Sequence, residues 1–161
     1  MDNMQRTTSA IKEQLIALLE KGRAHITFDD AVKEINSQVY GKKVDGLPYT
    51  LWQLVRHIQI AQKDILEFSR DPEYQSPSWP EGYWPKANAP KDRDEWNNCL
   101  QSIRADRDAF IQLLKKTEDI FAPFPHGDGQ NMLREALLIA DHNAYHTGQI
   151  IAIRRILNDY N

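Results

Sequence analysis

The most informative segment of the chain is Asp141-His142-Asn143-Ala144-Tyr145-His146-Thr147-Gly148-Gln149. It lies within a longer helical pattern that extends from about Asn131 to Tyr160. His142 and His146 are four residues apart, and this spacing places two side chains on one face of a helix, one turn above the other. Two imidazoles in this arrangement can bind one metal ion without any rearrangement of the backbone. We therefore predict that the last helix of the protein carries a metal site.

The helix face that carries both histidines is otherwise mostly aliphatic, and it comprises Leu138, Ile139, His142, Tyr145, His146, Gln149, Ile153 and Ile156. Helical bundles build their sites from inward-facing side chains on neighbouring helices. We therefore expect Tyr145 and Gln149 to support the histidines or to contact a substrate. Gly148 lies within the helix, where glycine costs about 1 kcal/mol relative to alanine. Its presence predicts a close approach by another helix or by a ligand.

Three further long helices are expected from the spacing of apolar residues, over about Thr8–Lys21, Leu51–Arg70 and Arg93–Phe121. Thr50 and Gln53 have the spacing of a capping box at the start of the second of these helices. A short helical piece is expected after Thr27. All eight prolines fall outside the four long helices, and no segment alternates as a strand would. The predicted fold is an all-α four-helix bundle with a long crossover loop between the second and third long helices.

The crossover loop, residues 71–91, contains five of the eight prolines, which disfavour regular structure there. It also contains four large aromatic residues, Tyr74, Trp79, Tyr83 and Trp84. A loop of this length within a domain is usually functional or packed down as a cover. The loop is therefore expected to lie on the bundle. Its aromatic residues either border the mouth of the site or simply cover the bundle surface.

A third imidazole, His57, lies at the edge of the buried stripe of the second long helix. Two ligands from one helix and one from another leave positions open for water or substrate, as in catalytic metal sites. The predicted metal ligands are His57, His142 and His146. The structural alternatives are a half-buried His57 bonded to a carbonyl group, and a pair of histidines at the edge of the core. Three histidines suit zinc, nickel, iron and copper alike.

The remaining polar residues give weaker indications. Asn143 stands where a His-Glu-x-x-His protease carries its glutamate base, so a zinc protease is disfavoured. Asp64, Asp141 and Glu135 are candidates for a general base or for a carboxylate that supports a ligand. Surface or helix-pairing roles are the alternative for each of them. Cys99 is expected to be a small buried residue, and no residue is assigned as catalytic.

Composition and charge narrow the class of protein. The chain has 161 residues, 41% of them hydrophobic, which indicates a single domain over residues 1–161. The formal net charge is −3 and no basic stripe is present, so nucleic acid is not an expected partner. The chain contains one cysteine and no apolar run long enough to span a bilayer. A cytoplasmic location is therefore expected, without membrane association.

Two segments resemble the DinB-like superfamily, whose members are also described as YfiT-like metal-dependent hydrolases. They are residues 47–66 (LPYTLWQLVRHIQIAQKDIL) and residues 133–150 (LREALLIADHNAYHTGQI). The resemblance implies a four-helix bundle over nearly the whole chain, and it matches His57, His142 and His146 to the metal-binding positions of that family. It also implies a divalent ion, with zinc and nickel foremost and iron as a further option, and often a homodimer. Relatives on this scaffold include S-transferases and isomerases that use low-molecular-weight thiols such as bacillithiol or mycothiol.

Two functions remain open at this point. In the first, the protein is an enzyme whose metal activates a thiol or water against a small-molecule substrate, as an S-transferase or a hydrolase. A thiol that carries carboxylates would need a cationic pocket, for which Arg56, Arg134 and Arg154 are candidates. In the second, the protein is a non-catalytic metal-binding bundle of a stress response. A sealed site with a fourth protein ligand would favour the second function, and an open site lined by polar groups would favour the first.

Overall fold

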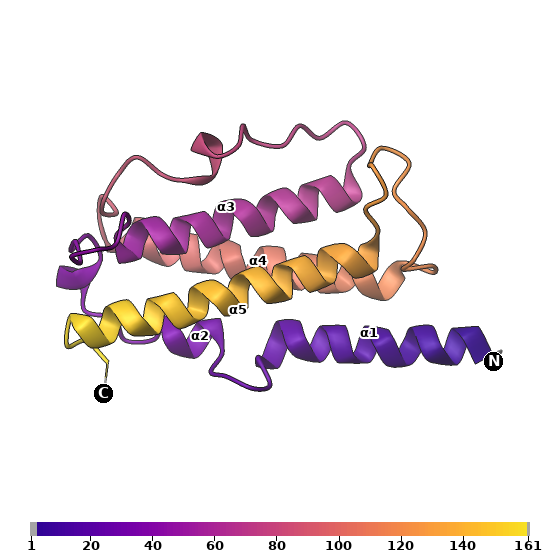
Figure 1. The fold of residues 1–161 in the computed structure, drawn as a ribbon, viewed down its shortest axis with the longest axis horizontal. Helices are drawn as coiled ribbons and strands as arrows, with labels where there is room; N and C mark the ends of the chain where they lie inside the picture. The colour runs from indigo at the N-terminus through magenta and orange to yellow at the C-terminus, as the bar shows by residue number, and fades with distance from the viewer. Residues whose placement is uncertain (1–2, 161) are drawn as a thin grey trace.

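Four long helices dominate the computed structural model, which describes residues 3–160 (Figure 1). They are α1 (Asn3–Lys21), α3 (Leu51–Arg70), α4 (Arg93–Lys116) and α5 (Met132–Ile156). Short elements in the connections are α2 (Phe28–Ala31), η1 (Ser37–Val39) and η2 (Glu81–Tyr83). No strand forms within residues 3–160, so the prediction of an all-α four-helix bundle is confirmed. Three residues of the predicted domain 1–161, namely Met1, Asp2 and Asn161, lie outside the described residues.

The directions of the helices follow from the lengths of their connections. The long loop after α3 returns along the outside of the bundle, so α3 and α4 run in the same direction (Figure 1). The shorter connection between α4 and α5 reverses the chain, and α5 runs antiparallel to α3. Residues of α3 therefore face α5 in reverse order, which brings the middle of α3 opposite the middle of α5.

Side-chain caps fix the first turns of the three core helices. The predicted capping box at the start of α3 is confirmed, because Thr50 Oγ1 accepts a hydrogen bond from the Gln53 backbone N–H at 3.2 Å. In return, Gln53 Oε1 accepts one from the Thr50 backbone N–H at 3.0 Å. Asp92 and Asn131 cap α4 and α5 through their side-chain oxygens. Such caps satisfy backbone N–H groups that have no partner within the helix.

Two predicted helix ends were wrong by several residues. Helix α1 begins at Asn3 rather than at Thr8. Helix α4 ends at Lys116 rather than at Phe121. The chain turns after Lys116 so that Ile120 becomes fully buried and its carbonyl accepts a hydrogen bond from the Leu133 N–H at 3.0 Å. An apolar residue at helical spacing can therefore belong to the core without belonging to the helix.

The C-terminal helix also ends earlier than predicted, at Ile156 rather than Tyr160. Asn158 adopts a left-handed conformation, with φ of 55°, and this turns the chain back toward α5. The buried guanidinium of Arg154 then binds Asp159, with Nε 2.9 Å from Oδ2, and donates to the carbonyl of Ala31 at 2.8 Å. Arg154 thus joins the end of α5 to α2.

The core consists of two apolar clusters that lie along the length of the bundle. One contains Trp52 and Trp96, and the other contains Phe110 and Met132. A polar link that joins α5, α3 and α4 lies between them. Asn143 Nδ2 donates to Gln62 Oε1 at 2.8 Å, and Gln62 Nε2 donates to the carbonyl of Ile103 at 2.6 Å. Gln62 is buried and Asn143 is partly buried, and polar groups paired in this way favour one alignment of the three helices.

The crossover loop is ordered along α3, as expected (Figure 1). Thr50 Oγ1 donates to the carbonyl of Asn88 at 2.6 Å, and Gln53 Nε2 donates to that of Pro85 at 3.1 Å. The residues at the start of α3 therefore also fix the position of the C-terminal part of the crossover loop through hydrogen bonds to its carbonyl groups.

The prediction that another helix approaches closely at Gly148 is wrong, and a close approach by a ligand there stays a prediction. Gly148 is exposed, and a Cβ atom at this position would meet nothing within 4 Å outside the local backbone. The structure gives no packing reason for a glycine there. Among residues 3–160, no helix combines the length and apolar character that a membrane span requires.

Candidate metal centre

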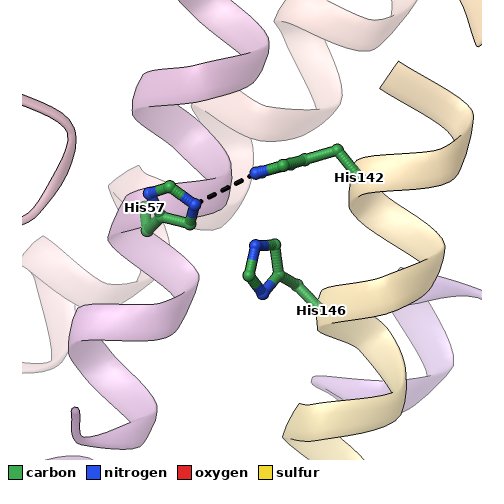
Figure 2. A group of neighbouring side chains, drawn as sticks. All are labelled: His57, His142 and His146. Atoms are coloured by element: carbon green, nitrogen blue, oxygen red, sulfur yellow. Dashed lines mark hydrogen bonds between the residues drawn. The ribbon is translucent and has the colours of Figure 1, made fainter. Parts of the chain in front are cut away.

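Three histidine side chains meet between α3 and α5 (Figure 2). His57 comes from α3, while His142 and His146 lie one turn apart on α5. The ligand atoms offered by the three rings all lie within 4.8 Å of one another, and His57 Nε2 is 3.0 Å from His142 Nε2. His57 and His146 are buried, with 4% and 6% of their surface exposed, and His142 is partly exposed.

Hydrogen bonds on the far side of two rings set their orientation. His57 Nδ1 lies 2.9 Å from the carbonyl oxygen of Tyr83, which can only accept, so this nitrogen carries the proton. His146 Nδ1 lies 2.7 Å from Gln149 Oε1 and donates in the same way. Each neutral ring then presents an unprotonated Nε2 to the centre. Metal-binding histidines in general donate their other N–H to an oxygen in this manner.

The environment keeps the three imidazoles neutral. Burial lowers the pKa of all three rings, and it lowers that of His142 to about 4, with further contributions from the neighbouring His146 and His57. A histidine must be neutral to bind a metal ion, so these rings are available as ligands at neutral pH.

The donor set fits a divalent ion. A tetrahedral ion with bonds of about 2.0–2.1 Å separates its nitrogen ligands by about 3.4 Å. The ring nitrogens of His57 and His142 are 3.0 Å apart, and all the ligand nitrogens lie within 4.8 Å of one another. Side-chain shifts on the order of 1 Å would bring these distances to the spacing that the ion requires. His57 Nε2 accepts a hydrogen bond from His142 Nε2 at 3.0 Å, and a metal ion bound by both rings would take the place of that proton. Within residues 3–160, no fourth histidine, cysteine or carboxylate joins the group.

The triad lies in the wall of an open cavity of about 560 Å³. The indole of Trp84, from the crossover loop, stacks on the His57 ring with a centroid distance of 4.0 Å and an interplanar angle of 1°. Tyr83 and Trp79 of the same loop also line the cavity. Trp79, Tyr83 and Trp84 therefore border the site, as the first of the two alternatives for the loop aromatics predicts, whereas Tyr74 does not line the cavity.

The two residues predicted to support the histidines both lie at this cavity. Gln149 Oε1 accepts a hydrogen bond from His146 Nδ1, as described above. The Tyr145 ring packs against that of His146, with centroids 4.9 Å apart, and 64% of Tyr145 is exposed at the rim.

Two of the three candidate carboxylates reach the cavity. Asp64 and Asp141 line it, whereas Glu135 is buried beside Arg134, outside it. The Tyr83 hydroxyl donates to Asp64 Oδ2 at 2.6 Å, while Asp64 Oδ1 is buried and has no hydrogen-bond partner. Burial and the nearby Asp64 carboxylate raise the pKa of Tyr83 well above its usual value. Tyr83 therefore remains protonated and can keep donating to Asp64.

None of the three candidate arginines lies at the cavity. Arg56 extends over the Trp52 ring toward another surface of the bundle. Arg134 pairs with Glu135, and the buried Arg154 binds the C-terminal turn. No lysine or arginine of the described chain lines the cavity. The suggested role of these arginines in binding the carboxylates of a thiol is therefore not supported.

Sequence reasoning missed the roles of Trp84 and Asn143. The aromatic composition of the loop was a visible signal for Trp84, but its contact with His57 depends on the path of the loop. Asn143 stands where a zinc protease carries a glutamate, but its side chain forms the partly buried hydrogen bond to Gln62. Cys99 is buried as expected, and burial raises the pKa of its thiol to about 11, which does not favour a nucleophile.

The fold and the site together define a helical bundle with three histidines that can hold a metal ion. The family model of the DinB superfamily matches residues 13–150, and the chain belongs to that superfamily. No curated protein and no solved structure matches the chain at a significant level.

Proposed function

We propose that this protein is a metal-dependent hydrolytic enzyme whose zinc or nickel ion is held by His57, His142 and His146. The observation that carries the proposal is the convergence of three neutral imidazoles in the wall of an open cavity, without a fourth protein ligand in the described chain. Three protein ligands and an open position are typical of catalytic zinc sites, whereas structural sites are closed by four. The non-catalytic alternative is disfavoured for the same reason.

A divalent ion at this position would supply a Lewis acid that lowers the pKa of a water molecule or thiol beside it. The chain contributes the remaining elements of the site. The Tyr83 carbonyl and Gln149 hold two histidine rings in place. The Trp84 indole covers one face of His57 and keeps solvent from it. Asp141, which lines the cavity and precedes His142, is available to accept a proton.

The lining of the cavity favours hydrolysis over transfer of an acidic thiol. Low-molecular-weight thiols with several carboxylates need cationic partners, and the lining contains two carboxylates and no lysine or arginine. Water needs no such partner. The hydrolytic version of the enzyme therefore agrees better with the charges at the site.

The first test is the metal content of untagged protein, compared with that of the double variant His142→Ala, His146→Ala. His25→Ala serves as the matched control, because His25 is exposed and lies outside the triad. We expect about one ion per chain in the parent and in the control, and none in the double variant. Absence of metal from the parent after exposure to zinc and nickel would overturn the proposal.

The second test concerns the reaction. A panel of uncharged and cationic esters, amides and lactones is offered to metal-loaded protein, to chelator-treated protein and to the double variant. Hydrolysis that requires both the metal and the two histidines supports the proposal. Metal binding without turnover of any compound, together with turnover of thiol adducts, would favour an S-transferase instead.

A further inference from the structure

The charges at the cavity are of one sign. Among residues 3–160, its lining contains the carboxylates of Asp64 and Asp141 and no lysine or arginine. The carboxylates are therefore the charged groups that this part of the chain places at the cavity.

Asp64 differs from Asp141 in its surroundings. Asp141 is exposed, and solvent screens its charge. Asp64 is partly buried and faces two hydroxyl groups: the Tyr83 hydroxyl donates to Oδ2 at 2.6 Å, and the Tyr74 hydroxyl also interacts with the carboxylate. The other oxygen, Oδ1, is buried without a partner. An unsatisfied buried acceptor is unfavourable, and rotation of the carboxylate toward the cavity would let a ligand donate a hydrogen bond to it and remove the cost.

Aromatic rings border the same end of the cavity. Tyr83 contacts Asp64 directly, and Trp79 packs against Tyr83 with ring centroids 5.4 Å apart. Trp79 is 73% exposed and lines the cavity, so part of its ring is accessible to a ligand. A carboxylate beside aromatic faces is a favourable environment for a positively charged nitrogen, through charge pairing and cation–π attraction.

Asp64 and the three histidines are well separated along the cavity. Asp64 follows His57 by seven residues on α3, which corresponds to a rise on the order of 10 Å along the helix axis. The apolar side chains of Ala61, Ile65 and Leu138 also line the cavity. A charge bound at Asp64 would therefore lie away from a metal ion at the triad.

We propose that the cavity binds small amines, with the ammonium group at Asp64, an apolar body along the cavity wall and the reacting group at the histidines. This inference rests on the proposed function in treating the cavity as a substrate site, and it adds the chemical class of the substrate. Asp64 acts here as a specificity residue, since it would hold the ammonium group away from the reacting bond.

The test uses three probes of similar shape: 2-phenylethylamine, 2-phenylethanol and 3-phenylpropanoate. Their binding to the full-length protein is measured by titration calorimetry, in the metal-loaded form and after metal removal. We expect the amine to bind more tightly than the alcohol in both forms, by about tenfold, as a charge-assisted hydrogen bond allows. The propanoate is expected to bind only in the metal-loaded form, through its carboxylate.

Asp64→Asn supplies the matched perturbation, because it keeps the shape of the side chain and an oxygen for the Tyr83 hydroxyl. It should weaken amine binding about tenfold and change alcohol binding less than about twofold. Asp108→Asn, at an exposed carboxylate of α4, is the control and should change neither affinity. The probe series on the parent protein gives a result that does not depend on how the variant folds.

The outcomes separate this inference from the proposed function. Equal binding of amine and alcohol, or an unchanged amine affinity in folded Asp64→Asn, would overturn the inference while leaving the metal site intact. Amine binding confined to the metal-loaded form would also overturn it, because the nitrogen would then be a metal ligand. A preference for amines in protein that takes up no metal would support the inference and refute the metal-dependent reaction.

Discussion

Replacing Gln149 by methionine would test whether the hydrogen bond behind His146 contributes to metal binding. Gln149 Oε1 accepts from His146 Nδ1 at 2.7 Å, and methionine has a similar length without a comparable acceptor. Loss of this bond frees the ring to rotate and leaves a partly buried N–H without a partner. A hydrogen bond of this kind contributes about 1 kcal/mol, and loss of a group that orients a metal ligand typically lowers affinity by 10- to 100-fold. We expect zinc affinity to fall about tenfold.

The affinity is measured by competition with a chromophoric chelator at neutral pH, with circular dichroism to confirm the helical fold. Gln149→Glu should bind zinc at least as tightly as the parent, because a carboxylate accepts the same proton more strongly. Gln101→Met, on the exposed face of α4, makes the same substitution away from the histidines and should leave zinc affinity unchanged. A zinc affinity of Gln149→Met within twofold of the parent, in a folded protein, would refute the assignment of Gln149 as a positioning residue.

Three further outcomes can be checked by equilibrium unfolding in urea. Trp84→Ala removes the ring stacked on His57 at 4.0 Å and should lower the free energy of unfolding by about 2 kcal/mol. Trp84→Phe keeps an aromatic ring and should lower it by less than half of that amount. Equal losses in the two variants would exclude the stacking as the cause. In metal-free protein, the folded-state pKa of His142 of about 4 lies below its usual 6.5, so the unfolded state binds more protons between these values. The contribution of His142 to the free energy of unfolding should therefore be fully present above pH 6.5 and fall by about 2 kcal/mol as the pH approaches 4, after allowance for solvent screening. His142→Ala should make the free energy of unfolding depend less steeply on pH in this range. An unchanged pH dependence would contradict the conclusion that His142 is buried in its neutral form. Arg154→Ala leaves Asp159 partly buried without its cation and should lower the free energy of unfolding by about 3 kcal/mol, more than Asp159→Asn does. A loss below about 1 kcal/mol would show that this ion pair does not hold the C-terminal turn.

The helices that carry the histidines were predictable because their signals are local. The capping box of Thr50 and Gln53 marks the start of α3, and the four-residue spacing of His142 and His146 places both rings on one face of α5. The position of His57 at the edge of a buried stripe then brings a third ring inward. Helical periodicity is sufficient for each of these steps.

Features that depend on distant contacts were not predictable in this way. Arg56 is adjacent to His57 in sequence, yet consecutive helical residues point about 100° apart, and Arg56 faces a different surface. The end of α4 was overestimated because burial of Ile120 depends on its contact with the start of α5. The contact of Trp84 with His57 similarly depends on how the loop is bonded to residues at the start of α3.

The contact between Tyr83 and His57 has a consequence for how this protein can change during evolution. The orientation of His57 depends on the main-chain carbonyl of residue 83, and every amino acid supplies such a carbonyl. The side chain of the same residue contacts Asp64 at the other end of the cavity. Substitutions at position 83 can therefore alter which molecules the cavity accepts while the orientation of His57 is retained. Ligand preference and metal binding can diverge independently, although one residue of the crossover loop takes part in both.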